Sequence, residues 1–189
     1  MVMRKGTSVR GRVDAGYMRK RGVKSSKTSM KVMKSDEMTR DFEDKIIDWC
    51  TFYRRNIHRF VEHYFGIDLH LYQKIMIYLM NLCPVVVLVC SRAIAKSFMT
   101  ALYACAVCVL YPNSKVVATA KIKKTANLLV KEKIQKELML MSPNLCREIK
   151  TIRTNQNDTE VVFHNGSSFV TTACNDEARG ARSTVLIVD

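Results

Sequence analysis

Three short apolar runs, rich in β-branched residues and separated by segments with helical periodicity, constrain the fold more than any other feature of the chain. They span residues 84–90 (PVVVLVC), 114–120 (SKVVATA) and 183–189 (STVLIVD). A continuous β-branched run is typical of a strand that is buried on both faces of a parallel sheet. The runs therefore predict an α/β fold with a mainly parallel sheet flanked by helices.

Periodicity and turn signals place the remaining elements. The expected helical segments are 36–66, as two short helices broken near Asn56 and stopped at Gly66, then 68–81, 97–110, and 121–142, which Pro143 ends. The side chains expected to point inward from the last of these are Leu128, Leu129, Ile134, Leu138 and Met141. Asn165-Gly166 joins two strand-like runs, 160–164 and 168–173, and predicts a β-hairpin.

Charge is distributed unevenly along the chain. Residues 1–40 contain twelve Lys or Arg and three acidic residues, and the whole chain of 189 residues has a formal charge of +14. We therefore predict a basic, disordered arm over 1–40, a helical lead-in over 41–83 and one α/β core over 84–189. Positive charge draws a chain toward nucleic acid or anionic membranes. Nucleic-acid contact and a solubilising leader both remain open for the arm.

Cysteine usage favours a reducing compartment, because the seven cysteines are an odd number without the paired spacing of a disulfide framework. Cys105 and Cys108 form a CxxC within an apolar helix, and we interpret them as buried small side chains rather than as a zinc or redox site. The longest apolar run, 98–112, is too short for a membrane span, so we expect a soluble protein.

A candidate phosphate-binding loop lies between the first apolar run and the next helix, in CSRAIAKSF (residues 90–98). In the pattern GxxxxGK[ST], backbone N–H groups surround the phosphates, the Lys reaches the β and γ phosphates, and the hydroxyl binds Mg²⁺. Lys96 and Ser97 match these side chains, whereas Cys90 and Ala95 stand in the two glycine positions. The alternative is an ordinary helix start that contains a lysine.

The last run, VLIVD, ends in Asp189 and lies about ninety residues further on, as a Walker B strand does when its aspartate orients Mg²⁺. The alternative is a core strand that ends at an acidic turn. Together with the loop, the run predicts a P-loop NTPase-type sheet with an N-terminal helical segment and a β-hairpin insertion.

From about Trp49 to Asp189 the chain resembles the large terminase subunits of tailed bacteriophages, the ATPases that drive DNA into preformed capsids. The motifs that carry the resemblance, in order, are WCTFYRRNIHRFVEHYFGIDLHLYQKIMIYLM, CSRAIAKSF, LYPNSKVVATA, VVFHNGSSF and ARGARSTVLIVD. The resemblance implies ATP and Mg²⁺ as cofactors and double-stranded DNA as the substrate that is moved.

The resemblance also assigns roles residue by residue. The loop that would hold the nucleotide comprises Ser91, Arg92, Ala93, Ile94, Ala95, Lys96 and Ser97. Arg92 and Lys96 would act on the phosphates in cis, and Ser97 and Asp189 would hold the metal. Gln73 would read the adenine edge with Tyr72 nearby. Arg179, with Arg182 in the same segment, would reach the nucleotide of a neighbouring subunit.

Further expectations follow from the family. They are a homo-oligomeric ring, a portal and a small terminase subunit as partners, no membrane, and action at the procapsid in the bacterial cytoplasm. The family's catalytic glutamate follows directly after the aspartate that Asp189 matches, so we expect a truncated ATPase domain with weak ATP binding and little hydrolysis. The alternatives are a catalytically inactive, basic nucleic-acid-binding α/β module and a helicase-like fragment.

Overall fold

The computed structural model describes residues 23–91, 93–154, 159–173 and 182–188. The chain divides into two compact units, Met1–Trp49 and Cys50–Asp189. Helix α2 (Val23–Arg55) begins in the first unit and ends in the second. The predicted arm therefore contains helix from residue 23 onward, and residues 1–22 lie outside the described part of the chain.

Short helices open the second unit. After α2 ends at Arg55, the chain forms α3 (Ile57–Phe60), the π-helical turn η1 (Val61–Phe65) and α4 (Leu71–Leu82). The predicted break near Asn56 is confirmed, since Asn56 precedes α3 with a non-helical ψ of 59°. The predicted stop at Gly66 is also confirmed, because Gly66 has φ 69° and ψ 27°, a conformation that glycine adopts at low cost.

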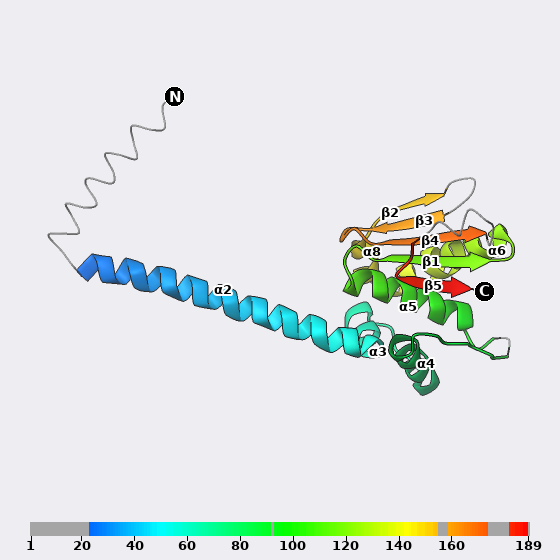
Figure 1. Cartoon of the computed structure of the whole chain (residues 1–189), viewed down its shortest axis with the longest axis horizontal. Helices are drawn as coiled ribbons and strands as arrows, with labels where there is room; N and C mark the ends of the chain where they lie inside the picture. Colours follow the sequence, from blue (N-terminus) through cyan, green and yellow to red (C-terminus); the bar gives the residue numbers. More distant parts are fainter. Residues whose placement is uncertain (1–22, 92, 155–158, 174–181, 189) are drawn as a thin grey trace, which may run out of the picture. The chain divides into compact units, whose positions relative to one another are not determined.

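The sheet has five strands in the order β2-β3-β4-β1-β5. Their bounds are β1 (Lys115–Ala120), β2 (Ile149–Thr154), β3 (Thr159–Phe163), β4 (Ser168–Ala173) and β5 (Val185–Val188). Strand β1 pairs in parallel with β4 and β5, while β2–β3 and β3–β4 are antiparallel (Figure 1). The α/β class is confirmed, but the sheet is mixed rather than mainly parallel.

The strand predicted over residues 84–90 is wrong. This segment is extended but pairs with no strand among the described residues, and Val85, Val87 and Val89 are 80%, 80% and 91% exposed. Strand β1 already has β4 and β5 on its two sides, and the segment does not pair with β5, which lies at the edge of the sheet. A high β-propensity reflects fit to a pleated, half-buried surface, and the segment finds no such surface here.

Helix α5 (Lys96–Leu110) is the centre of the core, as its apolar sequence predicts, and ten of its 15 residues are buried. The α5 side chains pack with Val116, Ala118 and Phe169 from one face of the sheet, and with η2 (Leu129–Leu138). Figure 1 shows α5 running alongside the strands. No helix in the described part of the chain is long and apolar enough to cross a membrane.

The helix predicted over 121–142 consists of three pieces, α6 (Lys123–Leu128), η2 and α7 (Met139–Met141). The π-helical turn of η2 buries Val130, Ile134 and Leu138, each four residues from the next. Leu128 and Met141 are 41% and 52% exposed, so their predicted inward orientation is wrong. The wider turn shifts the buried positions away from a regular α-helical pattern.

Pro143 begins a further helix, α8 (Pro143–Glu148), rather than only ending the previous one. The Ser142 hydroxyl accepts a hydrogen bond from the Leu145 N–H at 3.2 Å and caps this helix. The predicted hairpin is confirmed by β3 and β4, and Gly166 in its turn has φ 83°. A Cβ at Gly166 would lie 2.4 Å from Asn113 Oδ1, so the turn requires glycine.

Candidate functional site

The candidate site is the connection that leads from residue 90 into α5. Ala93 and Ala95 both have left-handed backbones, with φ 68° and 59°. A left-handed conformation costs an L-residue about 1–3 kcal/mol, and glycine adopts it without that cost. Ala95 stands in a glycine position of the phosphate-loop pattern, so the backbone there has the conformation that glycine favours although the side chain is a methyl group.

Lys96 links the two ends of this connection by a hydrogen bond. Its Nζ donates a hydrogen bond of 2.6 Å to the backbone carbonyl of Cys90, six residues earlier. An ammonium group has three N–H donors, so one bond to a carbonyl leaves two donors for another acceptor. The side chain of Lys96 is half-buried. The positive charge is thus held over the loop that precedes α5.

The first turn of α5 supplies backbone donors. Ala95 is the N-cap, and none of the described side chains caps this end. The first backbone bond of the helix runs from Met99 N to Ala95 O at 2.9 Å. The N–H groups of the first turn in any α-helix have no acceptor within the helix, and the helix dipole makes this end positive. Together with Lys96, the turn favours an anion.

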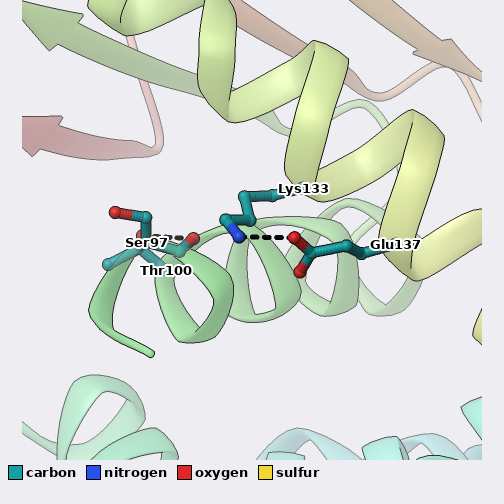
Figure 2. A network of polar contacts seen from close by, with 4 residues as sticks. All are labelled: Ser97, Thr100, Lys133 and Glu137. Atoms are coloured by element: carbon teal, nitrogen blue, oxygen red, sulfur yellow. Dashed lines mark hydrogen bonds and ion pairs between the residues drawn. The ribbon is translucent and has the colours of Figure 1, made fainter. Parts of the chain in front are cut away.

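Ser97 lies exposed on the same turn. Its carbonyl accepts a hydrogen bond of 3.0 Å from Thr100 Oγ1, and its own hydroxyl bonds to none of the described residues. Figure 2 shows this contact together with the Lys133–Glu137 ion pair of 2.5 Å on η2, the helix that packs against α5. The Ser97 hydroxyl is therefore accessible to a cation from solvent.

The sheet presents its parallel carboxyl ends on the same side. Thr119 in β1 lies level with Val188 in β5, at the ends of two parallel strands. Figure 1 shows the arrowheads of β1, β4 and β5 at the end of the sheet where α5 begins. In α/β proteins this edge is the usual place for ligands. Arg92, Arg179 and Asp189 lie outside the described residues, whereas Arg182 is exposed just before β5.

Tyr72 and Gln73 lie on α4. Gln73 is 8% exposed, and its Oε1 accepts a hydrogen bond of 2.9 Å from the His70 N–H, so it caps the start of α4. Tyr72 is 45% exposed and stacks on the His70 ring, with the ring centroids 6.0 Å apart. The Gln73 carbonyl oxygen is thus engaged within its own helix, and its role in reading adenine stays a prediction.

Buried thiols lie in the same helix as the site. Cys105 and Cys108 are both fully buried, as the sequence indicates. Burial raises the pKa of the Cys108 thiol to about 12, and burial, with a smaller effect of Cys108, raises the pKa of Cys105 well above its ordinary value. Both thiols therefore stay protonated at neutral pH and behave as small core side chains.

A concavity lies between α4 and the segment formed by α3 and η1, with a volume of about 360 Å³ and a lining that includes His58, Glu62, Lys74 and Tyr78. Lys74 Nζ lies 2.6 Å from Glu62 Oε1. Burial opposes ionisation of Glu62, but the hydrogen bond and positive charge of Lys74 outweigh it and lower the pKa of that carboxyl. Burial and the charge of Arg59 lower the pKa of His58. The pocket shares no residue with the loop at α5.

Within the described residues, no group of three or more His, Cys, Asp or Glu side chains is arranged to hold a metal ion. Comparison with protein-family models and with characterised proteins finds no match for this chain.

Fold and site together define an α/β protein with a five-stranded mixed sheet. Its helix α5 starts without a cap from the described side chains, and Lys96 at that start bonds to the carbonyl of Cys90 in the preceding loop. The sequence did not indicate that the Cys90 carbonyl accepts a bond from Lys96 or that Ala93 has a left-handed backbone, because neither property depends on residue type.

Proposed function

We propose that the loop from Cys90 to Ser97 binds the phosphates of ATP with Mg²⁺, and that the chain is an ATPase of a DNA-packaging motor similar to the large terminase subunits. The observation that carries the proposal is the bond from Lys96 Nζ to the Cys90 carbonyl, made directly in front of the uncapped start of α5. The Lys96 ammonium gains energy when a phosphate oxygen replaces the neutral carbonyl as its acceptor, because the attraction between opposite charges is added to the hydrogen bond.

In this function Lys96 leaves the Cys90 carbonyl and pairs with a phosphate oxygen. The backbone N–H groups at the start of α5 donate to the same anion, and the Ser97 hydroxyl supplies an oxygen to the cation. Mg²⁺, when bound, neutralises charge on the phosphates. Arg92 and Arg179 are proposed to stabilise the charge that develops during hydrolysis, and Asp189 to orient the metal.

The wider proposal concerns partners. The formal charge of +14 supports an interaction with double-stranded DNA, because lysine and arginine neutralise phosphates and release counterions. By the resemblance, the active form is a homo-oligomeric ring that contacts a portal and a small terminase subunit at a procapsid in the bacterial cytoplasm. Tyr72 and Gln73 are proposed to border the base.

Titration with a fluorescent ATP analogue, with and without Mg²⁺, tests the proposal. We expect saturable binding that requires Mg²⁺ and weakens at least tenfold in Lys96→Ala, since one charge-assisted contact to a charged group is worth about 1.5–3 kcal/mol. The matched control is Lys115→Ala, which removes an equal charge from an exposed position at the start of β1. Equal affinities in the two variants would contradict the proposal.

A second candidate, a catalytically inactive nucleic-acid-binding module, is favoured by the same excess of positive charge. It predicts no Mg²⁺-dependent binding of the ATP analogue and salt-dependent binding of duplex DNA that Lys96→Ala leaves unchanged. The logarithm of that affinity should fall linearly with the logarithm of salt concentration. The titration with the ATP analogue thus distinguishes the two functions.

A further inference from the structure

Two stretches of the second unit have backbone that pairs with no strand among the described residues. One is the outer edge of β5, which is the last strand of the sheet and pairs only with β1. The other is segment 84–90, which leads into the start of α5. Figure 1 shows the arrowhead of β5 at the end of the sheet where α5 begins. Both stretches therefore lead to the same end of the sheet.

Strand β5 lacks the features that usually protect an edge strand. Edges commonly carry a charge, a proline or a bulge, because unpaired N–H and C=O groups recruit a further strand. The sequence of β5, VLIV, has neither charge nor proline, and its register with β1 is continuous. Leu186 and Val188 are 59% and 71% exposed. The outer edge of β5 is thus open to another strand.

Segment 84–90 has the composition and the alternation of such a strand. It is uncharged and β-branched, and its only proline is the first residue, where a strand tolerates it. Exposed side chains alternate along it with the half-buried Val86 and Leu88, and the exposed ones are Val85, Val87 and Val89. Strand β5 alternates in the same way, with Leu186 and Val188 exposed. The two stretches therefore match in the side chains that each presents to solvent.

Helix α5 determines the direction of the segment. It begins at the carboxyl end of the sheet and leads, after Leu110, to β1, which starts at the amino end (Figure 1). A stretch that runs into α5 therefore points toward the carboxyl end, parallel to β1 and β5. A crossover helix is the usual connection between parallel strands of one sheet. Alignment at the shared end, with exposed side chains level, sets Val87 beside Leu186 and Val89 beside Val188.

We propose that segment 84–90 adds to the outer edge of β5 as a sixth, parallel strand when a phosphate group binds at the candidate loop, and that the bond between Lys96 and Cys90 controls this step. In the structure, Lys96 Nζ holds the Cys90 carbonyl at 2.6 Å, so the end of the segment is tied to the first residue of α5. A phosphate that takes Lys96 releases this carbonyl. The inference rests on the proposed function, because ATP supplies the phosphate.

The paired state gains in two ways. Backbone groups of both stretches satisfy each other, and the exposed valines lie beside Leu186 and Val188, which removes apolar surface from water. The segment belongs to the same chain, so its effective concentration at the edge is high without a second molecule. Since Lys96 cannot hold the carbonyl and the phosphate with the same donor, phosphate binding and strand pairing favour each other.

Hydrogen exchange of the whole chain, read by mass spectrometry, tests the proposal. A non-hydrolysable ATP analogue with Mg²⁺ should slow exchange at residues 85–89, and at the outward amides of 185–188, at least tenfold, because these amides become paired. The matched control is β2, the strand at the other edge of the sheet, whose exchange should not change. Unchanged exchange at 85–89 in a chain that binds the analogue would overturn the proposal and leave the proposed function standing.

Lys96→Met separates the strand from the nucleotide. Methionine cannot donate to the Cys90 carbonyl, so residues 85–89 should exchange at least tenfold more slowly than in the wild-type chain when no nucleotide is present. The control is Lys115→Met, which replaces an exposed lysine at the start of β1 and should exchange as the wild-type chain does. Fast exchange in Lys96→Met would overturn the control by Lys96. Slow exchange in Lys96→Met, in a chain that binds no ATP analogue, would support that control and count against the proposed function alone.

Crosslinking under oxidation tests the register and the partner. Val87→Cys with Leu186→Cys places two thiols on adjacent strands about 4.8 Å apart, within the Cα separation of a disulfide, and should crosslink within one chain when the analogue is bound. Val86→Cys with Leu186→Cys is the control, since these side chains would point to opposite faces of the sheet. A disulfide between two chains, identified by mass spectrometry of mixed isotope-labelled protein, would show pairing with a second copy and contradict the proposal.

Discussion

The two ends of α5 are built in opposite ways. At the carboxyl end, Asn165 Nδ2 donates to the carbonyls of Cys108 and Val109 at 2.7 and 3.1 Å, and Arg54 Nε donates to the carbonyl of Leu110 at 3.0 Å. At the amino end, the described residues provide no side-chain cap, and Lys96 bonds back to Cys90 instead.

This difference shows which end of α5 is held in place by tertiary contacts. Side chains from the hairpin and from the end of α2 satisfy the last carbonyls of α5, so that end is anchored to distant parts of the second unit. The Arg54 guanidinium also lies 5.0 Å from the centre of the Tyr111 ring. The amino end keeps its backbone donors for solvent or for a ligand, as a phosphate site requires.

The largest expected effect is at the anchored end. Asn165→Ala removes two hydrogen bonds to α5 and the bond that Asn165 Oδ1 accepts from the Ser167 N–H at 3.1 Å. We expect the free energy of unfolding to fall by about 3 kcal/mol, since each lost bond costs about 1 kcal/mol. Urea denaturation monitored by circular dichroism measures the loss.

Ser97→Ala at the open end is the counterpart of that variant. The Ser97 hydroxyl is exposed and bonds to none of the described residues, so the free energy of unfolding should change by less than about 0.5 kcal/mol. Equal losses in Asn165→Ala and Ser97→Ala would remove the distinction between the two ends of α5.

The pH dependence of stability gives a smaller effect in the buried half of α5, because its measurable part, between pH 9 and 10.5, is at most about 2 kcal/mol for Cys108. Burial raises the pKa of Cys108 from 9.0 to about 12 in the folded chain. The unfolded chain therefore ionises first, and this contribution to stability, complete below pH 9, is lost as the pH rises from 9 toward 12. The loss is at most about 1.4 kcal/mol per pH unit for one group.

Urea denaturation at a series of pH values from 8 to 10.5 measures this slope. Cys108→Ala should make the slope shallower without abolishing it, because alanine has no proton to lose and Cys105, whose pKa burial also raises, keeps its contribution. The control is Cys83→Ala, which replaces an exposed thiol and should leave the slope unchanged. A slope that is the same in the wild-type chain and in Cys108→Ala would show that Cys108 does not govern it.

A gain in stability, smaller than the loss expected for Asn165→Ala, is expected at the open end. Ala95 has φ 59°, so Ala95→Gly relieves backbone strain and should raise the free energy of unfolding by about 1 kcal/mol. The control is Ala104→Gly in the middle of α5, which should lower the same quantity by about 1 kcal/mol. Destabilisation by both variants would indicate that the loop does not hold Ala95 in the left-handed conformation.

Local features were predicted well because their causes are local. Gly66 and the Asn165-Gly166 turn need backbone conformations that few residues adopt, so residue type alone indicates them. Segment 84–90 was predicted wrongly because a strand needs a partner as well as propensity, and the segment pairs neither with β1, which has β4 and β5 on its two sides, nor with the edge strand β5. Strand β2 was missed because its pattern of Ile, Lys, Thr and Arg is weakly apolar.

The features of the candidate site also fall into those that residue type predicts and those that it does not. Lys96 and Ser97 were predicted from the loop pattern, since their chemistry depends on residue type. The Cys90 acceptor and the left-handed Ala93 were not, because any residue has a carbonyl and alanine carries no signal for positive φ. The proposed adenine role of Gln73 now competes with its capping bond to His70.

The sequence by itself determined the α/β class, the central apolar helix, the hairpin and the side chains at the candidate loop, because periodicity, turn residues and ionisable groups act over a few neighbouring positions. The tertiary structure alone decided that β1 lies between β4 and β5 and that η2 has a π-helical turn. It also decided that distant side chains cap the carboxyl end of α5. These outcomes depend on competition among segments far apart in the chain, and that competition is settled only when the core is packed.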